Sequence, residues 1–173
     1  PKYKPFYRAL AERQLPFLSH VGYEFSLIGK DQSVGEPDRL RLALEEGATV
    51  IAAHACSYGL ILYEKFLPTL RDLVTRYPHF YADISALTLP NRMRMLLHLR
   101  QYPELHERLL FGTDYPLSVF HMAAWGRVAL GTLRKMIGTK NRFDRQVEVC
   151  NGLQLGFRSL GDLLPHSSGM AGH

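Results

Sequence analysis

The sequence has few cysteines and no long apolar run. Cys56 and Cys150 are its two cysteines, and they have neither the spacing of a zinc knuckle nor the density of a secreted disulfide scaffold. No apolar run approaches the roughly 18 residues that a membrane span needs. No basic segment followed by an apolar one opens the sequence, which argues against export. We therefore expect a cytoplasmic protein without a membrane-spanning segment.

Acidic residues are scarce in the last third of the chain. The net charge is +5, and after Asp114 seven basic residues stand against three acidic ones. Most of this excess lies in residues 125–146, which we interpret as a basic outer helix and loop with a solvated face. A patch for phosphate or for an acidic partner is the alternative. No nucleic-acid-binding motif accompanies the charge, so we expect no nucleic-acid partner.

The length and composition favour one domain. With 173 residues, of which 46% are hydrophobic, the chain is long enough to build a sizeable core. Its last ten residues, LPHSSGMAGH, are small, polar and aperiodic. We place the domain at residues 1–160 and predict a flexible tail at 161–173.

Four strand-like apolar runs alternate with helical patterns. The runs cover residues 15–20, 48–54, 79–85 and 108–114. The helical patterns cover residues 4–14, 36–47, 61–78, 89–108 and 123–138. This alternation predicts βα units and a parallel sheet, hence an α/β fold. The spacing alone does not separate a barrel from an open doubly wound sheet.

Proline and glycine set the expected ends of two helices. Pro37 suits the first turn of the 36–47 helix, and Gly47 suits its end. In the 61–78 pattern, Pro68 implies a kink or a late start. The apolar residues expected on one stripe of that helix are Leu62, Phe66, Leu70 and Leu73.

Ionisable side chains close the apolar runs. The runs end in His20, in His54, in Asp83 with Ser85, and in Asp114. The carboxyl ends of parallel strands lie on one face, so these groups are predicted to converge there. Imidazoles and carboxylates are ligands for a divalent metal such as zinc. Taken singly, each histidine also fits a hydrogen-bonded structural role, Asp83 fits a buried pair, and Asp114 fits a turn cap.

The strand segments resemble a known family. LPFLSHVG, ATVIAAHACS, FYADISAL and LLFGTDYP are similar, in order, to the last four strand motifs of the amidohydrolase superfamily. Within it they resemble the amidohydrolase-related branch, which groups metal-dependent hydrolases with some nonoxidative decarboxylases. The resemblance runs from Leu15 to Pro116, and FGTDYP is its most specific piece. It implies that the chain is the C-terminal half, strands 5 to 8, of a TIM-type (β/α)8 barrel.

The resemblance also implies roles for three residues. His20 matches the metal ligand of the fifth strand. Asp114 matches the eighth-strand aspartate that binds metal and handles the proton of the attacking water. His54 matches the sixth-strand histidine, which binds a second metal or polarises the substrate and, in our interpretation, stabilises the developing oxyanion. The implied cofactor is a divalent metal, zinc in first place.

Two further residues are predicted to contact a small-molecule substrate. Ser85 shares a side of its strand with Asp83, and Tyr23 lies in the loop 21–36, whose composition suggests a mobile lid. The His-x-His pair of the family's first strand is absent from the sequence. We therefore expect the partner to be a missing N-terminal half or a second copy of the chain.

Three functions are compatible with this sequence. The first is a metal-dependent hydrolase in which activated water attacks a carbonyl at a C–N or C–O bond. The second keeps the site but decarboxylates an acidic substrate. The third is a half-barrel without catalysis that serves as a scaffold or pairing surface, because an open half-barrel exposes two sheet edges.

Overall fold

The chain forms an α/β fold around one parallel sheet, as a computed structural model describes it for residues 2–24 and 31–163. The strands pair in chain order, and their bounds are β1 (Phe17–Ser19), β2 (Val50–Ala52), β3 (Phe80–Asp83) and β4 (Leu109–Leu110). Each lies inside a run that the sequence predicts, so the parallel α/β arrangement is confirmed. Part of the predicted lid, residues 25–30, and most of the predicted tail, residues 164–173, lie outside the described residues.

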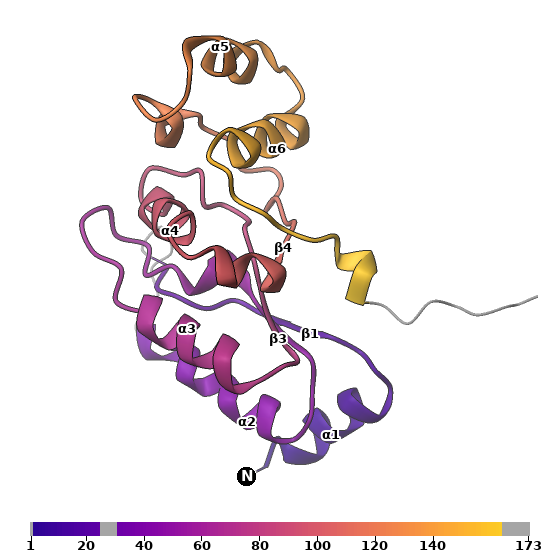
Figure 1. Cartoon of the computed structure of the whole chain (residues 1–173). Helices are drawn as coiled ribbons and strands as arrows, with labels where there is room; N and C mark the ends of the chain where they lie inside the picture. The colour runs from indigo at the N-terminus through magenta and orange to yellow at the C-terminus, as the bar shows by residue number, and fades with distance from the viewer. Residues whose placement is uncertain (1, 25–30, 164–173) are drawn as a thin grey trace, which may run out of the picture.

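α-Helices and 3-10 segments connect the strands and follow the last of them. The α-helices are α1 (Lys4–Glu12), α2 (Arg41–Glu45), α3 (Leu67–Arg76), α4 (Met93–Leu99), α5 (Leu130–Gly138) and α6 (Arg142–Gly152). The 3-10 segments are η1 (Gln32–Gly35), η2 (Pro37–Leu40), η3 (Ala53–Cys56), η4 (Pro103–Arg108), η5 (Met122–Ala124) and η6 (Leu160–Leu163). Figure 1 shows α1, α2 and α3 grouped at one end of the molecule and α5 with α6 at the other. No helix within the described residues combines the length and apolar character needed to cross a bilayer.

Helix α3 confirms one sequence prediction and contradicts another. Helix α3 begins at Leu67 with Pro68 in its first turn, which is the late start that proline allows. Leu62 therefore precedes the helix and is 83% exposed, so its place on the apolar stripe is wrong. Helix α6 begins inside the segment 125–146, which the sequence predicts as a basic helix and loop. The side chain of Asn141 caps it by accepting from the N–H groups of Phe143 and Asp144.

One face of the sheet packs on helices. Phe80 and Ala82 are fully buried, whereas Tyr81 between them is half-buried on the opposite face. The buried cluster joins Phe80 to apolar residues of α2 and α3, namely Leu44, Leu70 and Leu73. The buried residues that alternate along β3 thus pack against the apolar stripe of α3 in one layer.

One edge strand of the sheet, β4, is covered by another segment of the chain, whereas the other edge strand, β1, is more open. At β4, the N–H of Arg158 donates to Leu109 O at 2.8 Å, and the N–H of Phe111 donates to Arg158 O at 2.8 Å. The chain after α6 therefore covers that edge. At the other edge, β2 is the strand that pairs with β1 among the described residues, and the side chain of Leu18 is 60% exposed.

We expect Phe80→Ala to lower the free energy of unfolding by about 3–5 kcal/mol, because it removes a fully buried ring from the interface between sheet and helices. Leu62→Ala is the matched control, since that side chain is mostly exposed and its loss should change stability by less than about 0.5 kcal/mol. Urea unfolding measures both. Equal effects of the two substitutions would contradict the packing described here.

Candidate functional site at the carboxyl ends of the strands

Left-handed backbone follows every strand of the sheet. The φ angles are 91° at Gly22 after β1, 55° at His54 after β2, 56° at Ala86 after β3 and 53° at Asp114 after β4. Ala55 and Cys56 continue the left-handed run after His54. Such conformations cost on the order of 1 kcal/mol each in a residue with a side chain, and they persist where the surroundings impose them.

Asp83 holds the ends of β2 and β3 together. Its Oδ1 atom accepts from the N–H of His54 at 2.9 Å and from the N–H of Ser85 at 2.9 Å. The hydroxyl of Ser85 donates to the same oxygen. The Asp83 side chain is therefore a buried acceptor with three donors, which satisfies the carboxylate and fixes the turn at His54.

The partners of His54 determine which ring nitrogen carries the proton. Nδ1 lies 3.1 Å from Ser85 O and 2.9 Å from Ser85 Oγ. The carbonyl oxygen only accepts, and the hydroxyl proton already goes to Asp83, so Nδ1 must be the donor. In the neutral ring, Nε2 then presents a lone pair. His54 can donate from Nε2 toward an oxyanion only when it carries a second proton.

The three residues predicted as metal ligands lie side by side. Nε2 of His54 is 3.9 Å from Oδ2 of Asp114, and the rings of His20 and His54 meet edge to face with centroids 5.1 Å apart. His54 is buried, whereas the side chain of Asp114 is 43% exposed and His20 borders solvent. A hollow of about 170 Å³ lies beside His20. The structure thus brings the predicted residues together, and their chemical roles stay a prediction.

The described residues do not complete a metal site. Among residues 2–24 and 31–163, no three side chains of the His, Cys, Asp and Glu types are placed to hold one ion. A catalytic zinc takes three protein ligands and keeps one open position. His20, His54 and Asp114 have suitable donor atoms but do not reach that arrangement, so the expected zinc does not fit the described residues alone.

Tyr23 lies in an aromatic cluster beside the site. Its ring centroid is 4.8 Å from that of Tyr58 and 5.7 Å from that of Phe66, and its hydroxyl donates to Glu36 at 3.4 Å. Ser85 contacts His54 directly. Substrate contact by Tyr23 and Ser85 stays a prediction.

Sequence reasoning missed a buried arginine next to this site. Arg92 is 2% exposed and donates to Ser57 O, to Tyr23 O and to the carboxylate of Glu24. In the same cluster, burial raises the pKa of Glu64, which accepts from the Ser57 hydroxyl at 2.8 Å. An arginine within a helical pattern ordinarily predicts a solvated face, so the sequence carries no signal for this role.

The sequence analysis also did not identify Gln146, which connects the site to α6. The side-chain amide of Gln146 is buried and donates to Gly112 O at 2.6 Å and to Ile84 O at 3.3 Å. Both carbonyls lie just past the ends of β3 and β4. A Cβ atom on Gly112 would lie 3.2 Å from side-chain atoms of Asp83, so this close approach favours glycine.

The two cysteines take no part in the site's hydrogen bonds. Cys56 and Cys150 are free and buried, and burial raises the pKa of both thiols, that of Cys150 to about 12. Neither is a reactive thiolate near neutral pH.

Comparison with known proteins shows the architecture. No family model and no curated protein matches the sequence. An uncharacterized TIM-barrel protein from Bordetella bronchiseptica aligns with a TM-score of 0.53 and 16% sequence identity over 88% of this chain. That likeness shows the fold alone. The chain spans about half of that protein's length, 48%.

We expect His20 to titrate below its ordinary pKa of 6.5, because partial burial and the charges of His54 and Arg92 all disfavour its protonated form. Between the lowered pKa and 6.5, the unfolded chain binds more protons at His20. This site therefore destabilises the fold as the pH falls through that window. A titration of the imidazole resonances by NMR measures the midpoint.

His54→Asn should raise that midpoint, since it removes one of the neighbouring charges. His121→Asn is the control, because His121 is not among the groups that perturb His20. A midpoint at or above 6.5 in the unmodified chain would show that the two imidazoles do not share one environment.

Proposed function

We propose that this chain supplies the catalytic end of an amidohydrolase-related hydrolase and forms the C-terminal half, strands 5 to 8, of a (β/α)8 barrel. The observation that carries the proposal is the juxtaposition of His20, His54 and Asp114 past the carboxyl ends of three parallel strands. In barrels of this class that face carries the active site. The likeness to a TIM-barrel protein over about half of its length supports the barrel part of the proposal.

The chemistry follows from the two groups that face each other. Asp114 is exposed enough to meet a water molecule, and its carboxylate accepts a proton as the water oxygen bonds to a carbonyl carbon. The carbonyl electrons move to oxygen, and His54 with a proton on Nε2 donates to that oxyanion. Asp114 then returns its proton to the nitrogen or oxygen leaving group as the C–N or C–O bond breaks.

The hydrogen bonds of the site are consistent with Asp114 as the proton acceptor and His54 as the donor to the oxyanion. Ser85 fixes Nδ1 of His54 as a donor, so the second proton can only bind at Nε2, which points at Asp114. The zinc expected from the family resemblance remains a prediction, and none of these steps depends on it.

The open edge of the sheet supports completion by a second half-barrel. Strand β4 is covered by Arg158, whereas β1 is an end strand whose Leu18 side chain is 60% exposed. Leu18 aligns with Ile51 and Tyr81 across the sheet on the face that the main helix layer does not cover. When this chain is alone in solution, its β1 edge pairs with a second copy of the chain. An exposed parallel edge with an apolar side chain favours association.

We expect Asp114→Asn to lower hydrolysis of amides or esters by about 10²–10⁴-fold, because it removes the proton acceptor while keeping the size of the side chain. Asp144→Asn is the control, since it makes the same change at an exposed position in the first turn of α6. The assay follows initial rates on a panel of amides, esters and lactones over a range of protein concentrations.

The panel also includes aromatic and enoic acids with detection of carbon dioxide. Carbon dioxide release that disappears in Asp114→Asn would favour decarboxylation over hydrolysis. Equal rates in the two aspartate variants would contradict a catalytic role for Asp114. If no substrate turns over at any protein concentration, the scaffold interpretation is favoured.

We expect the chain to self-associate and Leu18→Asp to weaken that association, because a charge at the β1 edge opposes burial of this face. Leu62→Asp is the matched control, since Leu62 is also strongly exposed but lies before α3. Sedimentation velocity measures both variants. A monomeric chain at all concentrations, or equal effects of the two substitutions, would contradict association through β1.

A further inference from the structure

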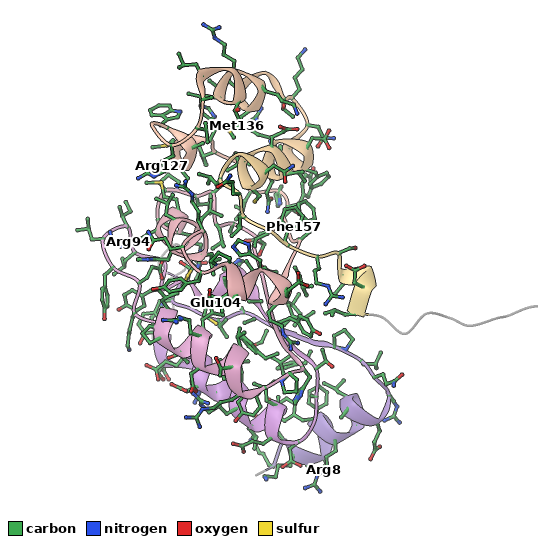
Figure 2. All side chains as sticks on the ribbon, in the orientation of Figure 1. Arg8, Arg94, Glu104, Arg127, Met136 and Phe157 are labelled. Carbon is green, nitrogen blue, oxygen red and sulfur yellow. The ribbon has the colours of Figure 1, made fainter. Side chains whose placement is uncertain are left out.

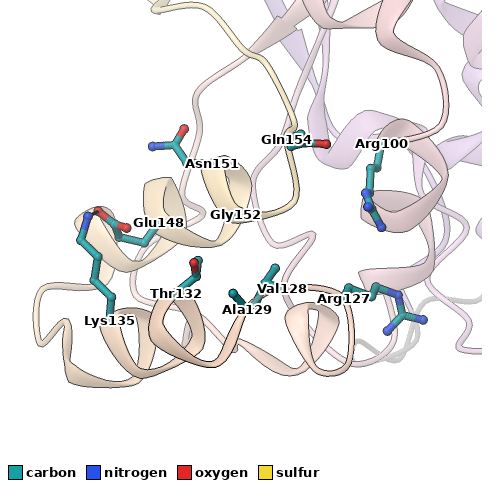
Figure 3. Close-up of a pocket in the computed structure, with 10 residues that line it drawn as sticks. All are labelled: Arg100, Arg127, Val128, Ala129, Thr132, Lys135, Glu148, Asn151, Gly152 and Gln154. Carbon is teal, nitrogen blue, oxygen red and sulfur yellow. Dashed lines mark ion pairs between the residues drawn. The ribbon is translucent and has the colours of Figure 1, made fainter.

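Two hollows adjoin one another between α4 and the pair of helices α5 and α6. Their volumes are about 500 Å³ and about 300 Å³, and both are lined by Arg100 and Arg127. Figure 2 shows Arg94 and Arg127 on the same side of the molecule, and Figure 3 shows the larger hollow between the helices. We call the two hollows together the basic cleft. Volumes in this range are typical of small-molecule sites.

Within the described part of the chain, no carboxylate forms an ion pair with the arginines of the basic cleft. None of the ion pairs within the described residues includes Arg94, Arg100 or Arg127. The carboxylate that lines the cleft, Glu148, is paired with Lys135 at 2.8 Å at its far end (Figure 3). Three guanidinium groups therefore border a concave surface without an acidic partner.

The donors of these arginines are largely available. Arg127 gives one donor to Trp125 O at 3.1 Å, and a guanidinium has five N–H donors in a planar fork. On α4, Arg94 and His98 are four residues apart and line the smaller hollow together. Burial and the charge of Arg94 lower the pKa of His98, so near neutral pH this imidazole is uncharged and contributes hydrogen-bonding capacity.

The cleft lies away from the candidate active site. Arg100 follows the end of α4, and from there the chain returns through η4 to the start of β4. His20, His54 and Asp114 are not among the residues that line the two hollows. A ligand in the basic cleft would not meet the groups proposed for hydrolysis.

We propose that the basic cleft binds a small oxyanionic ligand that carries phosphate groups or paired carboxylates. Arginine matches both anions in a bidentate geometry, and Arg100, half-buried and shared by the two hollows, is the central contact. The exposed side chains of Arg94 and Arg127 close around the ligand from either side. The amides of Asn151 and Gln154 line the larger hollow and add donors for further ligand oxygens.

The test is calorimetric titration of the whole chain with pyrophosphate and, separately, with citrate. We expect Arg100→Ala to weaken binding of the preferred anion by about tenfold or more, since it removes a charged hydrogen-bond donor. Its side chain forms no ion pair or protein hydrogen bond that holds the described fold together. Circular dichroism checks that the variant is folded, and Arg100→Lys tests the need for the guanidinium fork.

Arg134→Ala is the matched control, because it removes an equal charge from exposed α5 outside both hollows. Binding of pyrophosphate but not citrate identifies a phosphate ligand, and the reverse identifies a carboxylate ligand. If neither anion binds, or if both arginine variants weaken binding equally, the cleft is only a solvated basic surface and the proposal fails. Tighter binding of a single-stranded oligonucleotide, weakened by both variants, would likewise overturn it.

Discussion

The buried carboxylate of Asp83 is the constraint on which the candidate site depends. One of its oxygens accepts from the backbone of His54, from the backbone of Ser85 and from the Ser85 hydroxyl. Burial of a carboxylate away from water costs free energy unless hydrogen-bond donors surround it. Here the donors belong to the turns that the carboxylate stabilises. The left-handed conformation of His54 is therefore imposed by the end of the neighbouring strand.

The same constraint sets the chemistry of the imidazole. The Ser85 hydroxyl donates its own proton to Asp83, so it accepts the proton on Nδ1 of His54. Nε2 of His54 is then left facing Asp114. On the other side, the Gln146 amide holds the backbone after β3 and β4, and Gly112 allows β4 to approach Asp83 closely. Helix α6 thus helps to place the carboxylate of Asp114 without touching it.

The fold separates two charged regions. The carboxyl ends of the strands gather imidazoles and carboxylates, whereas the basic cleft between α4 and α5–α6 gathers unpaired guanidinium groups. Arg127 comes from the basic segment 125–146, whereas Arg94 lies in α4 and Arg100 follows it.

The sequence alone determined the parallel sheet, the positions of its four strands and the residues that close them, because period-two apolar runs and polar ends are local patterns. The late start of α3 was also local, since proline restricts its own turn. Tertiary structure decided the rest: Arg92 is buried, and Gln146 reaches two strand ends. These depend on contacts between segments far apart in the chain, which propensity and periodicity do not encode. For the same reason the proton of His54 could be assigned only once Ser85 and Asp83 were seen beside it.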